Sequence, residues 1–250
     1  MESVIDNHME RTKMLLYLVR HGEPDYTTDT LTGEGWNQAR FVADRLAESG
    51  IDEIHASPMG RARQTAAPTA EKLGLPVIIE PWAYELGKDC ETLFGDGKLK
   101  TISSIPAAYL HRPEFRKLDS LEGIAQIEGI RETAVAGRFE MLSKGFDALV
   151  GKEGYRRNGR GLYDILAPTD RHVALFCHMG MTRVLLAHAL NLPFHLLASS
   201  IMGSFTGVTI LEFRGTGSET SPVMLSLADT GHLFGRGGRT PLHCIGKKPY

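Results

Sequence analysis

Short runs rich in apolar residues recur along the chain, and three of them are followed directly by a segment with helical spacing. Runs of this length and composition are typical of strands that are covered on both faces of a sheet. Because strands that alternate with helices pack with right-handed crossovers, we predict an α/β fold: a doubly wound, mostly parallel sheet flanked by helices. The predicted strands are residues 14–19, 51–57, 76–80, 172–178, 205–213 and 222–229.

Three helices are predicted behind these strands. The first lies within residues 31–50, with Thr32 as its N-cap and Gly50 at its C-terminal stop. The second lies within residues 61–74, where Pro68 is expected to kink it, and the third spans residues 181–190. The face of the first helix that we expect to be buried carries Ala39, Val42, Ala43 and Leu46.

Residues 88–168 fit this alternation poorly, and we predict that they form a helical cap insertion in a single domain of residues 1–250. A long helical stretch in this region carries an apolar stripe with steps of four and three residues, which favours a helix that packs on the core. The basic segment 155–161 (YRRNGRG) is expected to be a solvated loop. The stripe consists of Val135, Phe139, Leu142, Phe146 and Leu149.

The net charge and the length of the apolar runs argue against nucleic-acid and membrane partners. A net charge of −2 and a pI of about 6.6 give no basic field of the kind that holds nucleic acid. The longest apolar runs are far shorter than the roughly 20 residues of a membrane-spanning helix, and the polar residues 1–11 lack a signal-peptide core. We therefore expect a soluble, cytoplasmic protein with neither a nucleic-acid nor a membrane partner.

Cysteine and histidine spacing gives no sign of a metal site. Cys90, Cys177 and Cys244 include no C-x-x-C pair, which argues against both a disulfide framework and a zinc knuckle. The 10 histidines include neither an H-x-H nor an H-E-x-x-H pair. We expect no metal and no other cofactor.

Reactive side chains follow four of the predicted strands. Arg20 and His21 end the first strand, Arg61 follows the second, Glu85 lies past the third, and His178 ends the fourth. In open α/β sheets, ligands bind outside the carboxyl ends of the strands. The sequence therefore predicts that these five side chains meet at one rim of the sheet.

These residue types suit a phosphoryl group. The planar fork of arginine matches phosphate oxygens, histidine acts as a nucleophile or a donor, and a carboxyl group protonates a leaving oxygen. Phosphoryl transfer depends mainly on positioning and on stabilisation of charge on the equatorial oxygens. Two guanidinium groups and a protonated His178 would supply that stabilisation without a metal.

From about residue 14 to residue 230, the chain resembles the histidine phosphatase superfamily, also called the phosphoglycerate mutase-like family. The resemblance rests on LVRHGE, LTGEGWNQA, SPMGRARQTA, YEL and FCHMG, in this order and spacing. It implies a phosphomonoester hydrolase that acts through a phosphohistidine intermediate on a small phosphorylated metabolite. His21 would be the nucleophile and Glu85 the proton donor. Arg20 and Arg61 would bind the substrate phosphoryl group, and His178 would be the second catalytic histidine.

Three departures from the family pattern leave details of the site open. The family often has a T-x-x-N stretch after RHGE, and its Asn is missing here; Tyr26, Thr27 or Thr28 are candidates to replace it. Met179 separates His178 from the glycine that commonly follows it.

The third departure is in the acid segment, where Glu91 is a rival to Glu85 as the proton donor. We favour Glu85 because it lies just after a strand. Residues 229–233 (DTGHL) also resemble the ending of some family members, with Asp229 and His232 as weaker candidates for the site.

Two other functions remain as alternatives. A phosphoglycerate mutase-type phosphoryl transferase would share the site, but residues 84–92 lack the E-R-H-Y-G type of motif that such mutases carry. A catalytically silent homologue that binds phosphorylated ligands would be expected to lose the nucleophile or the acid, and both are present. The sequence decides neither the physiological substrate nor the oligomeric state, and a homodimer is left open.

Overall fold

The computed structural model describes residues 12–93, 99–101, 130–215 and 217–234. Within these ranges, no helix is long and apolar enough to cross a membrane. Cys244 lies outside them, and Cys90 and Cys177 are buried free thiols.

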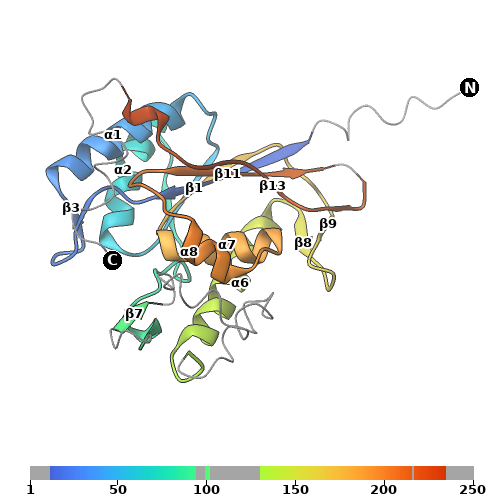
Figure 1. Ribbon diagram of the computed structural model, residues 1–250. Coiled ribbons are helices and arrows are strands. Elements are labelled where there is room, and N and C mark those ends of the chain that lie inside the picture. The colour runs from blue at the N-terminus through green and yellow to red at the C-terminus, as the bar shows by residue number, and fades with distance from the viewer. Residues whose placement is uncertain (1–11, 94–98, 102–129, 216, 235–250) are drawn as a thin grey trace, which may run out of the picture.

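A six-stranded sheet forms the centre of the fold, in the order β13-β11-β1-β10-β4-β5 (Figure 1). The neighbours β1, β10, β4 and β5 pair in parallel, whereas β11 pairs antiparallel with both β1 and β13. The predicted mostly parallel sheet is therefore confirmed. Its strands are β1 (Lys13–Arg20), β4 (Glu53–Ala56), β5 (Val77–Ile79), β10 (His172–Cys177), β11 (Val208–Arg214) and β13 (Val223–Asp229).

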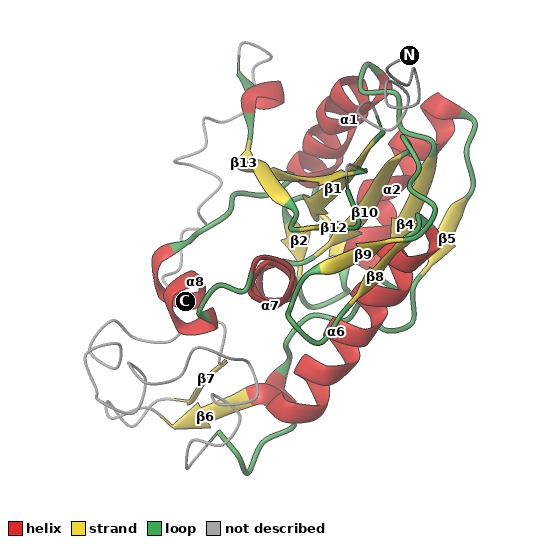
Figure 2. Ribbon diagram, turned by 90° about the vertical axis from the view of Figure 1, so that its right-hand side faces the viewer, coloured by secondary structure: helices red, strands yellow, loops and turns green. Residues whose placement is uncertain are grey.

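Helices cover both faces of this sheet (Figures 1 and 2). On one face, α1 (Gly33–Ala47) and α2 (Gly60–Leu73) enclose a core with β1, β4 and β10. On the other face, α6 (Val135–Lys152), α7 (Met179–Leu190) and α8 (Phe194–Ser200) enclose a second core. The predicted cap of α1 is confirmed, because the Thr32 hydroxyl accepts a hydrogen bond from the Gly35 N–H at 3.0 Å.

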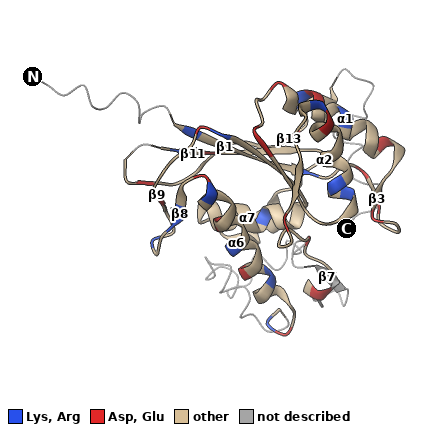
Figure 3. Ribbon diagram, turned by 180° about the vertical axis from the view of Figure 1, so that it is seen from behind, with Lys and Arg blue, Asp and Glu red and all other residues tan. Residues whose placement is uncertain are grey.

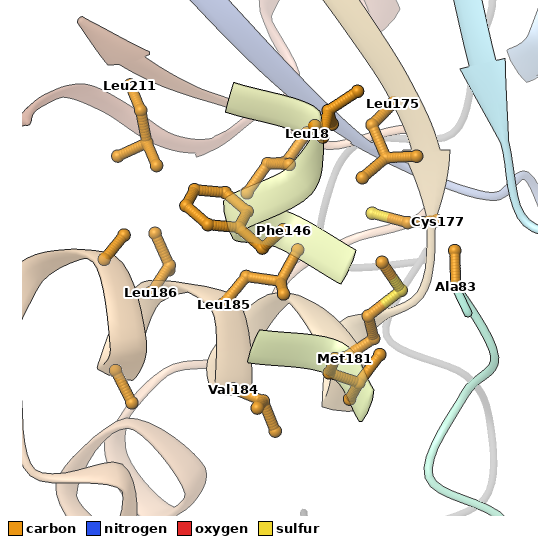
Figure 4. Close-up of a cluster of buried hydrophobic side chains, with 14 of the residues drawn as sticks. Leu18, Ala83, Phe146, Leu175, Cys177, Met181, Val184, Leu185, Leu186 and Leu211 are labelled. Atoms are coloured by element: carbon orange, nitrogen blue, oxygen red, sulfur yellow. The ribbon is translucent and has the colours of Figure 1, made fainter. Parts of the chain in front are cut away.

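The apolar stripe of α6 is buried, as its spacing predicts, and the structure shows that it packs on the central sheet. All five of its residues are buried, and they belong to the same core as β1, β10 and α7. Figure 4 shows Phe146 between Leu18 of β1 and Leu185 of α7. The helix therefore covers one face of the central sheet. Residues 102–129, the middle of the predicted cap insertion, lie outside the described residues.

The remaining elements are short. The β2–β3 hairpin (Pro24–Asp25, Thr30–Leu31) precedes α1. The 3₁₀ turn η2 (Lys88–Cys90) leads into β6 (Glu91–Leu93), which pairs with β7 (Leu99–Thr101). A second small sheet holds β8 (Tyr155–Arg157), β9 (Tyr163–Ile165) and β12 (Glu219–Thr220), and the 3₁₀ turn η4 (Gly231–Leu233) follows β13.

The expectation that the basic segment 155–161 is a solvated loop is wrong for its first three residues, which form β8 and include the fully buried Tyr155. Arg156 pairs with Asp164 at 3.0 Å, and Arg160 pairs with Glu219. The β8–β9 hairpin lies near the end of the sheet where β1 begins, and it carries both basic and acidic residues (Figures 1 and 3). This segment is therefore far from the carboxyl ends of the parallel strands.

Candidate active site

The pairing of β1 with β10 places two histidines side by side. Arg20 is opposite Cys177 at the last position of this parallel pair, and the His21 N–H donates to the Cys177 carbonyl at 3.0 Å. The next residues of the two strands are His21 and His178, whose ring centroids are 5.2 Å apart. His21 is 2% exposed and His178 is 0% exposed. The predicted rim thus brings both histidines together in a buried position.

A hydrogen bond to the backbone shows which nitrogen of the His21 ring carries the hydrogen. Its Nδ1 lies 2.8 Å from the carbonyl oxygen of Gly22, which can only accept, so Nδ1 carries the hydrogen and Nε2 keeps its lone pair. Burial, followed by the charges of Arg20 and Arg61, lowers the pKa of His21 well below 6.5. The imidazole is therefore neutral at pH 7 and offers a nucleophilic Nε2.

Gly22 is required for close packing behind this histidine. A Cβ atom at this position would lie 2.7 Å from the carbonyl oxygen of Gly35 in α1. The Gly22 N–H also donates to the Thr65 hydroxyl of α2 at 2.9 Å. The chain after β1 is thus fixed against both helices of that face.

Residues 203–207 hold Arg20 in place from the start of β11. The Arg20 N–H donates to the Gly207 carbonyl at 3.1 Å, and its guanidinium donates to the Gly203 carbonyl. The ring of Phe205 lies 4.4 Å below the Arg20 guanidinium and 5.7 Å from the His21 ring. Sequence reasoning missed Phe205, because nothing near it in the chain marks it as a site residue.

Arg61 lies in the first turn of α2, and it is 6% exposed. Its Nη1 pairs with the Asp29 carboxylate at 2.5 Å, and the same carboxylate accepts from the Gly60 N–H at 2.6 Å. The Tyr26 ring also lies 5.5 Å from the guanidinium carbon. The Nε atom of Arg61 is buried and has no hydrogen-bond partner among the described residues.

The loop after RHGE therefore contacts Arg61 through Tyr26 and Asp29. Of the three candidates for the missing asparagine, Tyr26 is the one that contacts this arginine among the described residues. The Thr28 hydroxyl bonds to Thr30 at 2.7 Å within the hairpin, and the Thr27 N–H donates to Asp25 at 2.8 Å. Asp29, which sequence reasoning did not consider, adopts the left-handed conformation with φ of 54°.

His178 occupies the N-cap position of α7. Its Nε2 lies 2.7 Å from the Ser57 hydroxyl, and its Nδ1 is buried without a partner among the described residues. Burial, and then the charges of His21, Arg61 and Arg20, lower the pKa of His178 well below 6.5. The protonated His178 expected from the sequence therefore requires a bound anion that raises its pKa.

Glu85 binds to the start of the same helix. Its carboxylate accepts from the Gly180 N–H at 3.0 Å and from the Met181 N–H at 2.8 Å. Met179, the unusual residue after His178, is the first residue of α7, and the N–H groups that follow it still face this acid. Glu91 lies on β6 and pairs with Thr101. Glu85 therefore lies beside the helix that begins after His178, whereas Glu91 lies on the β6–β7 hairpin.

The DTGHL segment contacts the site indirectly. His232 lies 3.0 Å from the Thr206 hydroxyl, and the Thr206 N–H donates to the His21 carbonyl at 3.3 Å. Asp229 pairs with Arg45 of α1 at 2.7 Å. This segment is therefore linked to the backbone of His21 through Thr206.

The assembled cluster is rich in cations and donors. Arg20, Arg61, His21 and His178 are all buried, and burial together with the positive charges of the two arginines lowers the pKa of both histidines. Buried donors without partners are costly unless a ligand satisfies them. In the described part of the chain, no group of three His, Cys, Asp or Glu residues could hold a metal ion. The cluster is suited to a small anion.

The lowered pKa values predict that the protein loses stability in acid. Below pH 6.5 the unfolded chain binds protons at these histidines, whereas the folded chain does not. The free energy of unfolding therefore decreases as the pH is lowered below about 6.5, and it is nearly constant above that pH. Between pH 7.5 and 5.5 each histidine accounts for up to about 1.4 kcal/mol of this loss. Urea unfolding of the wild type and His178→Gln at both pH values checks this, and an equal loss in both proteins would contradict it.

Comparisons with known proteins extend these observations. The model of the histidine phosphatase superfamily (branch 1) matches residues 16–127. A probable phosphoglycerate mutase of Serratia proteamaculans is 40% identical over 80 residues, which are 28% of this chain and 37% of that protein. The matched region is thus well under half of that relative. A similarly named protein of Photorhabdus laumondii is 28% identical over 148 residues, which are 52% of this chain and 69% of that protein.

Solved structures share the fold over most of the chain. A phosphoserine phosphatase from Entamoeba histolytica, in complex with 3-phosphoglyceric acid, has a TM-score of 0.57 and 22% identity, covering 88% of this chain and 99% of that one. A mycobacterial glucosyl-3-phosphoglycerate phosphatase has a TM-score of 0.55 and 22% identity, covering 87% and 100%. The family model and the named relatives thus show that part of the chain is similar to the histidine phosphatase superfamily, and the solved structures show that most of the chain shares their fold.

Proposed function

We propose that this protein is a metal-independent phosphomonoester hydrolase that acts through a phosphohistidine on a small phosphorylated metabolite. One observation carries the proposal: His21 presents an unprotonated Nε2 inside a buried cluster with Arg20, Arg61 and His178. A neutral imidazole that is surrounded by cationic and donor groups suits attack on a phosphoryl group whose oxygens are held by those groups.

The proposed reaction has two steps. In the first, Nε2 of His21 forms a bond to phosphorus while the bond from phosphorus to the ester oxygen breaks, and Glu85 gives its proton to the departing oxygen. In the second, water attacks the phosphohistidine, Glu85 takes a proton from that water, and inorganic phosphate leaves. Glu85 accepts hydrogen bonds from the first turn of α7, the helix that begins directly after His178, and this position supports the role.

Arginine side chains provide most of the charge in this scheme. Arg20 is held by residues 203–207 and Arg61 by Asp29, so both guanidinium groups are oriented before a substrate arrives. Such preorganised charge in a buried site costs no rearrangement during the reaction. The phosphoryl dianion would also raise the pKa of His178 and favour its protonation.

A phosphoglycerate mutase-type transferase is the main alternative. The named relatives include probable phosphoglycerate mutases, whereas the named solved structures include phosphatases. We favour hydrolysis because residues 84–92 lack the E-R-H-Y-G type of motif expected of a mutase. A silent phospho-ligand-binding homologue is disfavoured, since both His21 and Glu85 are present.

A panel of phosphomonoesters tests the proposed function. We expect steady release of inorganic phosphate from simple monoesters, including an aryl phosphate, and unchanged rates in excess EDTA. Loss of activity in chelator that added metal restores would refute metal independence. Interconversion of 2- and 3-phosphoglycerate with little phosphate release would identify a mutase. Tight binding of phosphate esters without turnover would identify the silent homologue.

We predict that the negative charge of Asp29, which pairs with Arg61, weakens the binding of phosphate to the site. Asp29→Asn keeps an oxygen for the Gly60 N–H and tolerates a positive φ, but it removes the negative charge beside Arg61. Because Asp29 is partly exposed, we expect inorganic phosphate to inhibit this variant at a concentration only about two- to fivefold lower than for the wild type.

The control for this experiment is Asp25→Asn on the same hairpin. Asp25 accepts from the Thr27 N–H, and within the described part of the chain it does not pair with Arg61. Inhibition of this variant by phosphate should match that of the wild type. Weaker inhibition of Asp29→Asn would show that Asp29 acts mainly by orienting Arg61.

A further inference from the structure

Ser57 lies directly behind His178. It is the first residue after β4, it is fully buried, and its N–H donates to the Phe176 carbonyl of β10 at 2.9 Å. This bond continues the pairing of β4 with β10 by one residue. The Ser57 hydroxyl thereby comes within 2.7 Å of Nε2 of His178, a residue 121 positions away in the chain.

A second contact determines which of the two groups donates. The Met59 N–H donates to the Ser57 Oγ at 3.3 Å, so this oxygen already accepts one hydrogen bond. The hydroxyl hydrogen then has Nε2 of His178 as its acceptor. If Nε2 carried the hydrogen instead, the hydroxyl hydrogen of Ser57 would be buried with no acceptor among the described residues, which is unfavourable.

We infer that Ser57 is a positioning residue that holds the neutral, ligand-free His178 in the tautomer with its hydrogen on Nδ1, so that the ring meets an arriving phosphoryl oxygen as a hydrogen-bond donor. The identity of that acceptor rests on the proposed function. The buried Nδ1 has no partner among the described residues, and the charged or titratable groups that act on this ring are His21, Arg61 and Arg20. A hydrogen on Nδ1 therefore requires an acceptor from a ligand.

The tautomer matters because His178 is neutral before an anion binds. Burial and the nearby cations lower its pKa, so it does not become a donor at both nitrogens at pH 7 without a ligand. In the other tautomer, Nδ1 would present a lone pair, which repels a phosphoryl oxygen. The Ser57 hydroxyl thus decides whether the ring attracts or repels the ligand.

Nitrogen NMR of the wild-type chain tests the tautomer directly. Full-length protein with ¹⁵N-labelled histidine is measured at pH 7 without phosphate, and His178→Gln identifies the signals of this ring. We expect a protonated Nδ1 and an unprotonated Nε2. A protonated Nε2 with an unprotonated Nδ1 would overturn the inference. This measurement needs neither activity nor a mutant of Ser57 that folds.

Binding of inorganic phosphate tests the consequence. Ser57→Ala is expected to bind phosphate about 10- to 100-fold more weakly and to populate both tautomers of His178. Ser226→Ala is the matched control, because it removes a partly buried serine hydroxyl of β13 that bonds to the Val208 carbonyl. Unchanged phosphate binding and an unchanged tautomer in Ser57→Ala would overturn the inference.

The outcomes separate this inference from the proposed function. Turnover of phosphomonoesters with a protonated Nε2 on His178 would leave the proposed function standing and refute the role of Ser57. A protonated Nδ1 and phosphate binding that depends on Ser57, without turnover of any ester, would support Ser57 as a positioning residue and refute the hydrolase.

Discussion

His21→Ala is expected to abolish covalent labelling of the protein by a phosphomonoester and to lower kcat/KM by about 10⁴- to 10⁶-fold. The effect is this large because no other residue can take the place of the nucleophile. The hydrogen bond from Nδ1 to the Gly22 carbonyl leaves Nε2 of His21 with its lone pair. Brief mixing of the wild type with labelled substrate, followed by quenching, should trap a phosphoryl group that is labile in acid and stable in alkali.

His188→Ala is the matched control for this experiment. His188 lies in the last turn of α7, at the opposite end of the helix from His178, and its Nε2 contacts Asp147 of α6 at 2.8 Å. It should keep full labelling. Label that persists in His21→Ala, or that is stable in acid, would show that His21 is not the nucleophile.

Glu85→Gln is expected to slow the hydrolysis of alkyl phosphates by about 10² to 10⁴-fold, the usual range for general acid catalysis. Alkoxides leave poorly without a proton, whereas nitrophenolate needs little help. Nitrophenyl phosphate should therefore lose much less in the phosphorylation step. Single-turnover kinetics on both substrates measure this difference.

Glu91→Gln is the control for this experiment, and it also tests Glu91 as the alternative proton donor. If Glu85 is the donor, Glu91→Gln should retain nearly normal rates on both substrates. Equal losses on both substrates in Glu85→Gln, with phosphorylation limiting the rate, would move the acid role elsewhere. Because Glu85 accepts bonds from Gly180 and Met181, thermal unfolding of Glu85→Gln is needed to separate lost chemistry from a disturbed start of α7.

Much of the sheet and its two helical layers follows from the local pattern. Apolar runs predicted β1, β4, β5, β10, β11 and β13, and the Thr32 cap and its spacing predicted α1. The antiparallel direction of β11 could not be predicted in this way, since strand direction depends on how the chain crosses the sheet. The short strands β2, β3, β8, β9 and β12 were missed because two or three residues carry no clear periodicity.

The buried stripe on α6 shows where the pattern was sufficient and where it was not. Spacing alone predicted that Phe139, Leu142 and Phe146 face a core. Only the structure shows that this core is the one beneath the central sheet, shared with α7. A periodic stripe records that a face is buried, but it does not identify the element that covers it.

By itself, the sequence determined which residue types stand at the carboxyl ends of the parallel strands, and therefore that His21 and His178 share one rim. The register of β1 with β10 follows from strand pairing and brings these histidines to 5.2 Å. Only the tertiary structure decided what holds them. Gly203 contacts Arg20 across 183 positions of the chain, with Phe205 packed beside the same guanidinium, and Ser57 contacts His178 across 121 positions. Such contacts depend on the packing of separate strands and loops, which no local spacing encodes.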